Sequence, residues 1–237
     1  MSPSGVVPSP NIWHWPAVYE LENRAQDVHG AIWSAVRAEC DWAGKDVLDV
    51  GCGDGFHLPR FAETARSVTG VEPYPPLVVR ARQRVAGLAG VRVTDGEAGR
   101  LPVPEASVDL VHARTAYFFG PGCEPGLAEA DRVLRPGGAL VVVDLDADCP
   151  PYGDWMRADL PSYDGSAVRR FFADAGFSTQ DVATTWEFAD RRALKSVLRI
   201  EFSKRTAAQA IAQTHELTIP VGYRVHIRRK PTGLVVR

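Results

Sequence analysis

Apolar and polar positions alternate along the middle of the chain in blocks of two kinds. Short apolar runs predict strands, and the stretches between them carry apolar residues at helical spacing and predict helices. In chain order the pattern predicts a strand at 47–51, a helix at 57–66, a strand at 67–72, a helix at 76–87, strands at 91–94 and 107–113, a helix at 123–135 and a strand at 138–145. Such alternation is typical of a mostly parallel sheet covered by helices on both faces. We therefore predict an α/β fold.

The last third of the chain predicts an extension of the same sheet. The apolar residues of 168–175 lie on one helix face, and Gly176 follows where a C-terminal cap is common. Residues 177–189 predict a strand, 190–214 two helices and 216–230 a last strand. The two helices are therefore an insertion before the last strand, free to help cover a ligand.

The beginning of the chain has a different composition. Residues 1–10 are rich in Pro, Ser and Gly, cannot offset their ordering entropy by burial, and predict a flexible arm. Apolar positions at helical spacing predict a first helix that begins at about Asp27 and ends before Lys45. We predict one domain over residues 11–237, because 237 residues are near the upper end of what one core organises.

Charge and composition narrow the possible partners. The net charge of −2 lacks the basic excess that draws proteins to nucleic acids or anionic membranes, so neither partner is expected. No apolar run approaches the roughly 20 residues that span a bilayer, and the opening residues lack the pattern of a signal peptide, so we predict a cytoplasmic protein. The four cysteines are scattered and suggest neither a zinc site nor a disulfide framework.

The decisive stretch for function is the strand and glycine-rich loop of residues 46–55. Glycine stands at every second position of the loop, at Gly51, Gly53 and Gly55, which lets the backbone turn tightly and approach a bound nucleoside. Dinucleotide sites usually have GxGxxG and a loop free of negative charge, because they hold a pyrophosphate. Here Asp49 precedes the glycines, repels pyrophosphate and attracts an ammonium group. S-adenosylmethionine has that ammonium and no phosphate.

Two further acids follow the next strands. Glu72 ends the second strand, where a carboxylate can accept hydrogen bonds from both ribose hydroxyls, although nicotinamide cofactor sites use an acid there too. After the third strand, Glu97 can accept from an adenine amino group while the Ala98 N–H reaches a ring nitrogen. Asp95 is the competing carboxylate. These positions indicate a ribose- and adenine-containing ligand.

Together VLDVGCGDG, GVEP, GEAGRLPVP before SVDLV, and RVLRPGGALVVVD resemble the class I S-adenosylmethionine-dependent methyltransferases, in particular the bacterial small-molecule enzymes. The resemblance covers about residues 46–145. It implies a Rossmann-like three-layer sandwich whose seven-stranded sheet is mostly parallel with an antiparallel last strand. For the cofactor S-adenosylmethionine it implies contacts from Asp49, Gly51, Cys52 and Gly53, from Glu72 and Pro73, from Gly96, Glu97 and Ala98, and from Ala113 and Arg114.

The sequence departs from this family after the fourth strand. Many relatives have a histidine five positions beyond the arginine, whereas Phe119 stands there in this chain, so that general base is absent. Metal-assisted relatives need an acid where this chain has Arg114 and Thr115, so we expect no metal. If the acceptor is a neutral hydroxyl, the candidate catalytic residues are His14, Tyr117 and Asp146.

Aromatic residues suggest a lid and an acceptor pocket. Similar enzymes place an N-terminal segment over the cofactor, so we predict that residues 11–40 form a lid and that Tyr19 covers the sulfonium. Rings from loops and strand ends suggest an aromatic-lined or apolar acceptor pocket. These rings are Tyr117, Phe118, Phe119, Tyr152, Trp155 and Trp186.

The predicted function is methyl transfer to the oxygen or nitrogen of a small-molecule acceptor with an aromatic or apolar body. Three alternatives remain open at this point. A methyltransferase for RNA or protein has only the basic segment HIRRK and the pair Arg191 and Arg192 in its favour. A nicotinamide-dependent oxidoreductase conflicts with Asp49 and the glycine spacing, and a non-catalytic subunit that binds the cofactor conflicts with the intact site residues. The sequence leaves the oligomeric state open.

Overall fold

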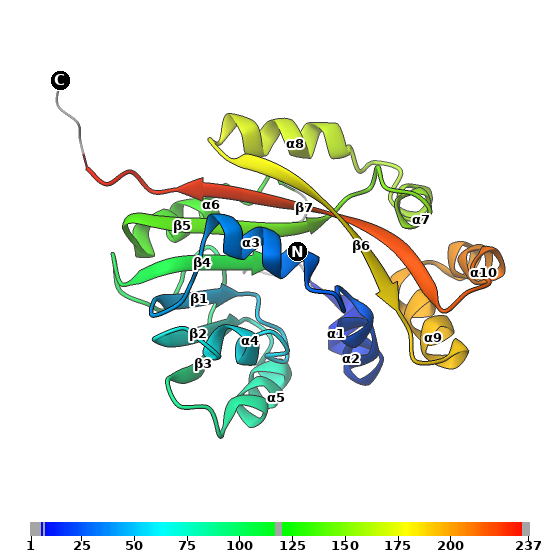
Figure 1. Cartoon of the computed structure of the whole chain (residues 1–237), viewed down its shortest axis with the longest axis horizontal. Helices are drawn as coiled ribbons and strands as arrows, with labels where there is room; N and C mark the ends of the chain where they lie inside the picture. The colour runs from blue at the N-terminus through cyan, green and yellow to red at the C-terminus, as the bar shows by residue number, and fades with distance from the viewer. Residues whose placement is uncertain (1–5, 7, 117–119, 234–237) are drawn as a thin grey trace.

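The computed structural model describes residues 6, 8–116 and 120–233, which contain a seven-stranded sheet in the order β3-β2-β1-β4-β5-β7-β6 (Figure 1). Its strands are β1 (Asp46–Val50), β2 (Ser67–Glu72), β3 (Val91–Asp95), β4 (Val108–Arg114), β5 (Leu134–Leu145), β6 (Ser178–Glu187) and β7 (Thr218–Arg229). The pairs from β3 to β5 are parallel, and β7 is antiparallel to both β5 and β6. The predicted mostly parallel sheet with an antiparallel last strand is confirmed.

Helices cover both faces of this sheet and complete a three-layer sandwich (Figure 1). The helices are α1 (Pro10–His14), α2 (Pro16–Ala25), α3 (Ala31–Glu39), α4 (Leu58–Ala62), α5 (Pro75–Val85), α6 (Glu124–Val133), α7 (Tyr152–Asp159), α8 (Gly165–Asp174), α9 (Arg191–Glu201) and α10 (Lys204–Gln213). Buried side chains of α3, α4 and α5 pack on one face, and those of α6 and α8 pack on the other. The sheet is therefore buried on both sides, as parallel sheets require.

The strand register brings the ends of distant segments together. Asp49 pairs with Gly70 of β2 on one side and with His112 of β4 on the other. A Cβ atom at Gly70 would lie 2.8 Å from the Cys52 sulfur, so only glycine lets the loop after β1 cross β2 at this height. The carboxyl ends of β1, β2 and β4 thus meet at one edge of the sheet, where α/β proteins bind ligands.

The N-terminal prediction was incomplete. The flexible arm of residues 1–10 lies mostly outside the described residues, but helices α1 and α2 follow it where only a segment ahead of a first helix was expected. Each begins with proline at its first position, where the missing N–H has no helical partner to lose. The next helix begins at Ala31 rather than at Asp27, because the Asp27 carboxylate accepts the Ile32 N–H and Gly30 adopts φ 70°.

The C-terminal third extends the sheet and adds helices at its carboxyl edge. Helix α7, which the sequence pattern did not indicate, follows β5, and α9 and α10 occupy the segment between β6 and β7. Helix α2 packs against α9, so the beginning of the chain meets the insertion (Figure 1). No helix among the described residues has the length and apolar character needed to cross a membrane.

Candidate functional site

The loop after β1 is a tight turn made of glycines in the left-handed region. Gly51, Gly53 and Gly55 have φ of 70°, 58° and 82°. Residues other than glycine adopt such angles at a cost of roughly 1–2 kcal/mol each. The N–H groups of Gly51 and Cys52 both donate to the Val71 carbonyl of β2. The turn is therefore fixed against the neighbouring strand at the carboxyl edge of the sheet.

Three buried carboxyl groups surround this loop. Asp49, Asp54 and Glu72 are 3%, 2% and 4% exposed. The Glu72 oxygens accept the N–H of Gly53 at 3.0 Å and of Tyr74 at 2.9 Å, and burial raises its pKa above the usual range. Burial and the fields of all three acids raise the pKa of the Cys52 thiol in their midst. The loop is thus surrounded by three carboxyl groups, of which the sequence indicated Asp49 and Glu72.

Asp49 has a partner that the sequence analysis missed. Its Oδ1 lies 2.7 Å from His112 Nδ1, and both side chains are buried. The His112 ring contacts Trp33 and Phe61, so the pair lies beneath the loop in an aromatic setting. Asp49 and His112 are 63 residues apart in the sequence, so only the register of β1 with β4 could have predicted that they meet. Contact of Asp49 with an ammonium group stays a prediction.

The segment after β3 carries the predicted adenine residues. Gly96 is confined, since a Cβ there would lie 2.7 Å from the Pro102 ring. Glu97 and Ala98 are half-buried, and the Glu97 carboxyl makes no hydrogen bond or ion pair within the described ranges. The competing carboxylate, Asp95, is exposed and paired with Arg82 at 3.3 Å. Of the two carboxyl groups, Glu97 is therefore the one without such a partner among the described residues, and its contact with adenine stays a prediction.

Helix α1 lies against the loop and the residues after β2. Trp13 stacks on Tyr74, which follows Pro73, with ring centroids 4.5 Å apart and an interplanar angle of 15°. A Cβ at Gly53 would lie 2.9 Å from the Ile12 side chain, so α1 touches the glycine turn itself. These contacts place the start of the predicted lid directly over the candidate site.

Helix α2 is tied to the same loop by an arginine. Arg84 of α5 pairs with Glu20 of α2 and, at 2.8 Å, with Asp54 of the loop. It also donates from Nε to the Asp54 carbonyl. This bridge was not predicted from the sequence, because its three members come from separate helices and loops.

The end of β4 contacts the other side of α2. Ala113 is fully buried, and the half-buried Tyr19 forms a hydrogen bond with Thr115. Arg114 donates to Gln26 Oε1 at 2.7 Å, and its guanidinium lies 5.3 Å over the Tyr223 ring. The lid and the predicted methionine-side residues are thus in direct contact.

The three candidate catalytic residues lie in different settings. His14 is exposed at the end of α1. Asp146 is paired with the buried Arg224 of β7, which occupies one of its oxygens. Tyr117 lies outside the described residues, as do Phe118 and Phe119. A catalytic role for each of the three stays a prediction.

The remaining predicted pocket aromatics are packed rather than open. Tyr152, Trp155 and Trp186 are each 2% exposed or less, and Tyr152 contacts both other rings. They join the core between β7 and the insertion. The wall that they form is therefore continuous with the hydrophobic core, because α7 turns Tyr152 and Trp155 inward and β6 buries Trp186.

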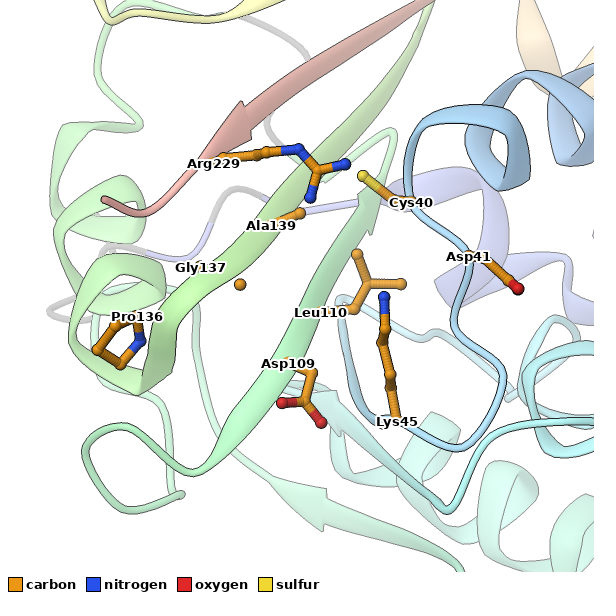
Figure 2. Close-up of a pocket in the computed structure, with 10 residues that line it drawn as sticks. Cys40, Asp41, Lys45, Asp109, Leu110, Pro136, Gly137, Ala139 and Arg229 are labelled. Atoms are coloured by element: carbon orange, nitrogen blue, oxygen red, sulfur yellow. The ribbon is translucent and has the colours of Figure 1, made fainter. Parts of the chain in front are cut away.

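A hollow of about 160 Å³ lies at the opposite edge of the sheet, beside the amino ends of β1 and β4. Figure 2 shows Lys45 and Arg229 together with Asp41 and Asp109 at its walls. Its charges are mixed, and none of the predicted site residues lines it. We assign it no function.

Comparison with known proteins identifies the part of the chain that carries the glycine loop. Residues 48–142 match a family model described as a methyltransferase domain. An uncharacterized 37.1 kDa protein in transposon TN4556 of Streptomyces fradiae is 31% identical over 192 residues, which are 70% of this chain and 53% of that protein. Demethylmenaquinone methyltransferase of Tropheryma whipplei is 34% identical over 146 residues, 57% of this chain and 58% of that enzyme.

The fold has many solved counterparts. The [4+2]-cyclase SpnF superposes with a TM-score of 0.62 at 22% identity, covering 97% of this chain and 100% of that one. At this identity the likeness shows the fold alone. The chain spans little more than half the length of the curated relatives above, so their activities do not pass to it without further argument.

Proposed function

We propose that this chain, which carries a class I S-adenosylmethionine-dependent methyltransferase domain, transfers a methyl group from that cofactor to a small-molecule acceptor. The domain is the one matched over residues 48–142, and its sheet has the order described above. S-adenosylmethionine is the methyl donor of this family. The acceptor that we propose has an aromatic or apolar body and is methylated at oxygen or nitrogen.

The observation that carries the proposal is the ring of buried acids around the glycine loop. Asp49, Asp54 and Glu72 bring three carboxyl groups to the place where a dinucleotide-binding loop would meet a pyrophosphate. Phosphates bind helix N-termini and loops that present N–H groups and positive potential. A ligand with an ammonium group and a ribose, and without phosphate, suits this loop instead.

The described residues fit S-adenosylmethionine, which when bound supplies an electrophilic methyl group on a sulfonium sulfur. Glu72 has its two oxygens aligned by backbone N–H groups and keeps lone pairs for ribose hydroxyls. Glu97 has a free carboxyl for an adenine amino group. The glycine turn leaves backbone where a Cβ would collide with Ile12. These groups would hold the nucleoside and methionine portions.

The chain itself contributes alignment and exclusion of water. Trp13 and Ile12 cover the loop, and the Arg84 bridge fixes α2 beside it. Such positioning can account for roughly 7–11 kcal/mol of the barrier in a displacement between aligned partners. A dedicated base is needed only for an acceptor that arrives protonated.

Two observations support an apolar or aromatic acceptor. The relative from Tropheryma whipplei is named for demethylmenaquinone. At the end of β4, the Arg114 guanidinium lies over the buried Tyr223 ring and close to the half-buried Tyr19. An acceptor beside the methionine portion would meet the Tyr19 ring.

The basic segment at the end of β7 does not favour a nucleic acid partner. Arg228 pairs with Asp131 at 2.7 Å, and Lys230 donates to the carbonyl groups of Asp131 and Leu134. These cations hold β7 to the end of α6 rather than forming a free basic surface. A small-molecule acceptor therefore remains the better proposal.

Calorimetric titration tests the cofactor. We expect S-adenosylmethionine and its demethylated product to bind the full chain, and NADH not to bind. Glu72→Ala should weaken binding about tenfold or more, because loss of a buried acceptor costs roughly 1–3 kcal/mol. Asp95→Ala is the matched control and should bind normally, since its carboxylate is exposed and paired with Arg82. Binding of NADH alone would overturn the assignment.

Mass spectrometry of ligands retained by the purified chain tests the acceptor. We expect an apolar or aromatic small molecule, and its incubation with labelled S-adenosylmethionine should give a product heavier by one methyl group. Retention of RNA fragments that accept the label would establish the alternative acceptor class. A chain that binds the cofactor and labels neither would be a non-catalytic subunit.

A further inference from the structure

Two carboxyl groups from opposite ends of the chain meet beside the end of β4. Glu22 of α2 is buried, and its carboxyl group neighbours that of Glu201 at the end of α9, where helix α2 packs against α9. Glu201 also accepts Asn11 Nδ2 at 2.6 Å and the Tyr152 hydroxyl at 2.7 Å. The Glu201 carboxyl group thus contacts both the lid, through Asn11, and helix α7, through Tyr152.

The contact between the two acids requires a proton. Two carboxylates in direct contact repel each other, and in a buried setting one of them takes up a proton instead. Glu22 Oε1 accepts from Gln26 at 2.8 Å, whereas Oε2 is buried and has no donor in the described part of the chain. A proton on Oε2 gives that atom an acceptor in Glu201. Burial, and then the field of Glu201, raises the pKa of Glu22 well above its usual range.

The pair is connected to a residue predicted to face the cofactor. Gln26, which donates to Glu22, accepts from Arg114 Nη2 at 2.7 Å. Arg114 ends β4, next to the glycine loop of β1. A continuous hydrogen-bonded path therefore runs from α9 through α2 to the methionine side of the site.

We propose that Glu22 and Glu201 form a proton-dependent latch, which holds α2 closed on α9 and thereby positions Gln26 and Arg114 for cofactor binding. The latch rests on the proposed function, because it names positioning residues of the same site. Loss of the shared proton leaves two negative charges in contact and separates α2 from α9. Cofactor affinity is then linked to pH through residues that do not touch the cofactor.

The other groups around the pair determine the direction of the effect. Arg114 of β4 favours the ionised form of Glu22. Tyr19 of α2, Tyr152 of α7 and Tyr223 of β7 are neutral, because burial raises the pKa of each. Both acids raise the pKa of Tyr19 and Tyr152 further, and Glu22 alone raises that of Tyr223. A carboxyl group with a raised pKa stabilises the closed state fully at low pH and loses that contribution as pH rises through the raised value. The latch therefore weakens as pH rises.

The test compares the affinity of the demethylated cofactor for the wild type and Glu22→Gln, by calorimetry between about pH 6 and about pH 9. The ligand's own amino group titrates equally in both experiments, so the ratio of the two affinities isolates the latch. We expect the wild type to lose at least about tenfold in affinity relative to Glu22→Gln as pH rises, which is the effect of one pKa unit. Glu216→Gln, at an exposed acid in the same third of the chain as Glu201, should follow the wild type.

A constant ratio across this range would overturn the latch, while binding itself would still support the proposed function. If neither protein binds the ligand, hydrogen exchange of the wild-type chain decides the latch independently. Exchange of α2 should then accelerate with pH beyond the intrinsic chemical rate, and that of β1 should not. Equal protection of α2 at both ends of the range would contradict the proposal, and it would also do so if Glu22→Gln failed to fold.

Discussion

The carboxyl edge of the sheet contains two regions that are built in different ways. Over β1, β2 and β3, the polar groups come from one loop and two strand ends within residues 49–97, and backbone N–H groups align them. Over β4, β5 and β7, they come from both ends of the chain. Asn11 and Glu201 are 190 positions apart, and Arg114 and Gln26 are 88 apart.

The first region is a local unit that can occur in many proteins, whereas the second depends on the arrangement of this whole chain. The first region needs only a strand, a glycine turn and acids at fixed spacing, so it can be inherited as a unit by proteins with different acceptors. The second needs the lid, the insertion and β7 to be present together. We expect the first region to determine the cofactor and the second to determine what is done with it.

The largest expected effect tests how much the stability of the first region depends on the buried pair of Asp49 and His112. His112→Ala removes the partner of the buried Asp49 and should lower the free energy of unfolding by about 3–5 kcal/mol. Urea denaturation measures it. His14→Ala, at an exposed ring, should change stability by less than about 0.5 kcal/mol. Equal stability of the two variants would mean that the Asp49 contact contributes nothing.

The second prediction concerns an unpartnered acid of the second region. Asp144 of β5 is buried, lies opposite Arg224, and has no hydrogen bond to either oxygen within the described residues. Burial raises its pKa from 3.8 to about 7, so its neutral form is favoured in the folded state. The stability present below about pH 4 should therefore be lost as pH rises to about 7, by up to about 4 kcal/mol.

Asp144→Asn should remove this loss. Urea denaturation at about pH 5 and about pH 8 should show that the free energy of unfolding of the variant increases relative to that of the wild type as pH rises. Asp174→Asn, at an exposed carboxyl, should keep the wild-type dependence. If the free energies of unfolding of Asp144→Asn and the wild type change equally between the two pH values, the Asp144 carboxyl has a partner in solution.

The smallest expected effect tests whether α1, which lies over the glycine loop, contributes to cofactor affinity. Trp13→Ala removes the ring stacked on Tyr74, an arrangement worth about 0.5–1.5 kcal/mol beyond its buried area, so cofactor affinity should fall a few-fold. Trp15→Ala removes a ring that is 57% exposed and should leave affinity unchanged. Calorimetric titration compares the two. If both variants bind as the wild type does, α1 covers the loop without holding the ligand.

The same division explains what could be predicted from the sequence. The second strand was predicted with its observed bounds, and the glycine turn was predicted from the residues of the loop itself. Both depend mainly on neighbours in the chain. Glu72 was singled out for the same reason, and the structure shows it buried at the loop. Short-range information was sufficient there.

The second region could not be predicted in this way. Helices α1 and α2 are short and carry aromatic and polar residues without a clear helical period, and their stability comes from packing. Glu22 and Glu201 look like ordinary surface acids of amphipathic helices until the fold brings them together. His112 likewise looks like an isolated histidine, because only strand register shows that it faces Asp49.

The contact between Asn11 and Glu201 also determines the order in which the molecule can be assembled. During synthesis the N-terminal helices leave the ribosome first, yet the end of α9 that receives them is made nearly 200 residues later. The glycine loop and its three parallel strands can form in the meantime from nearby segments. The lid is thus made before the sheet but reaches its partner only after α9 has been made, and until then its aromatic residues remain exposed to other chains and to chaperones.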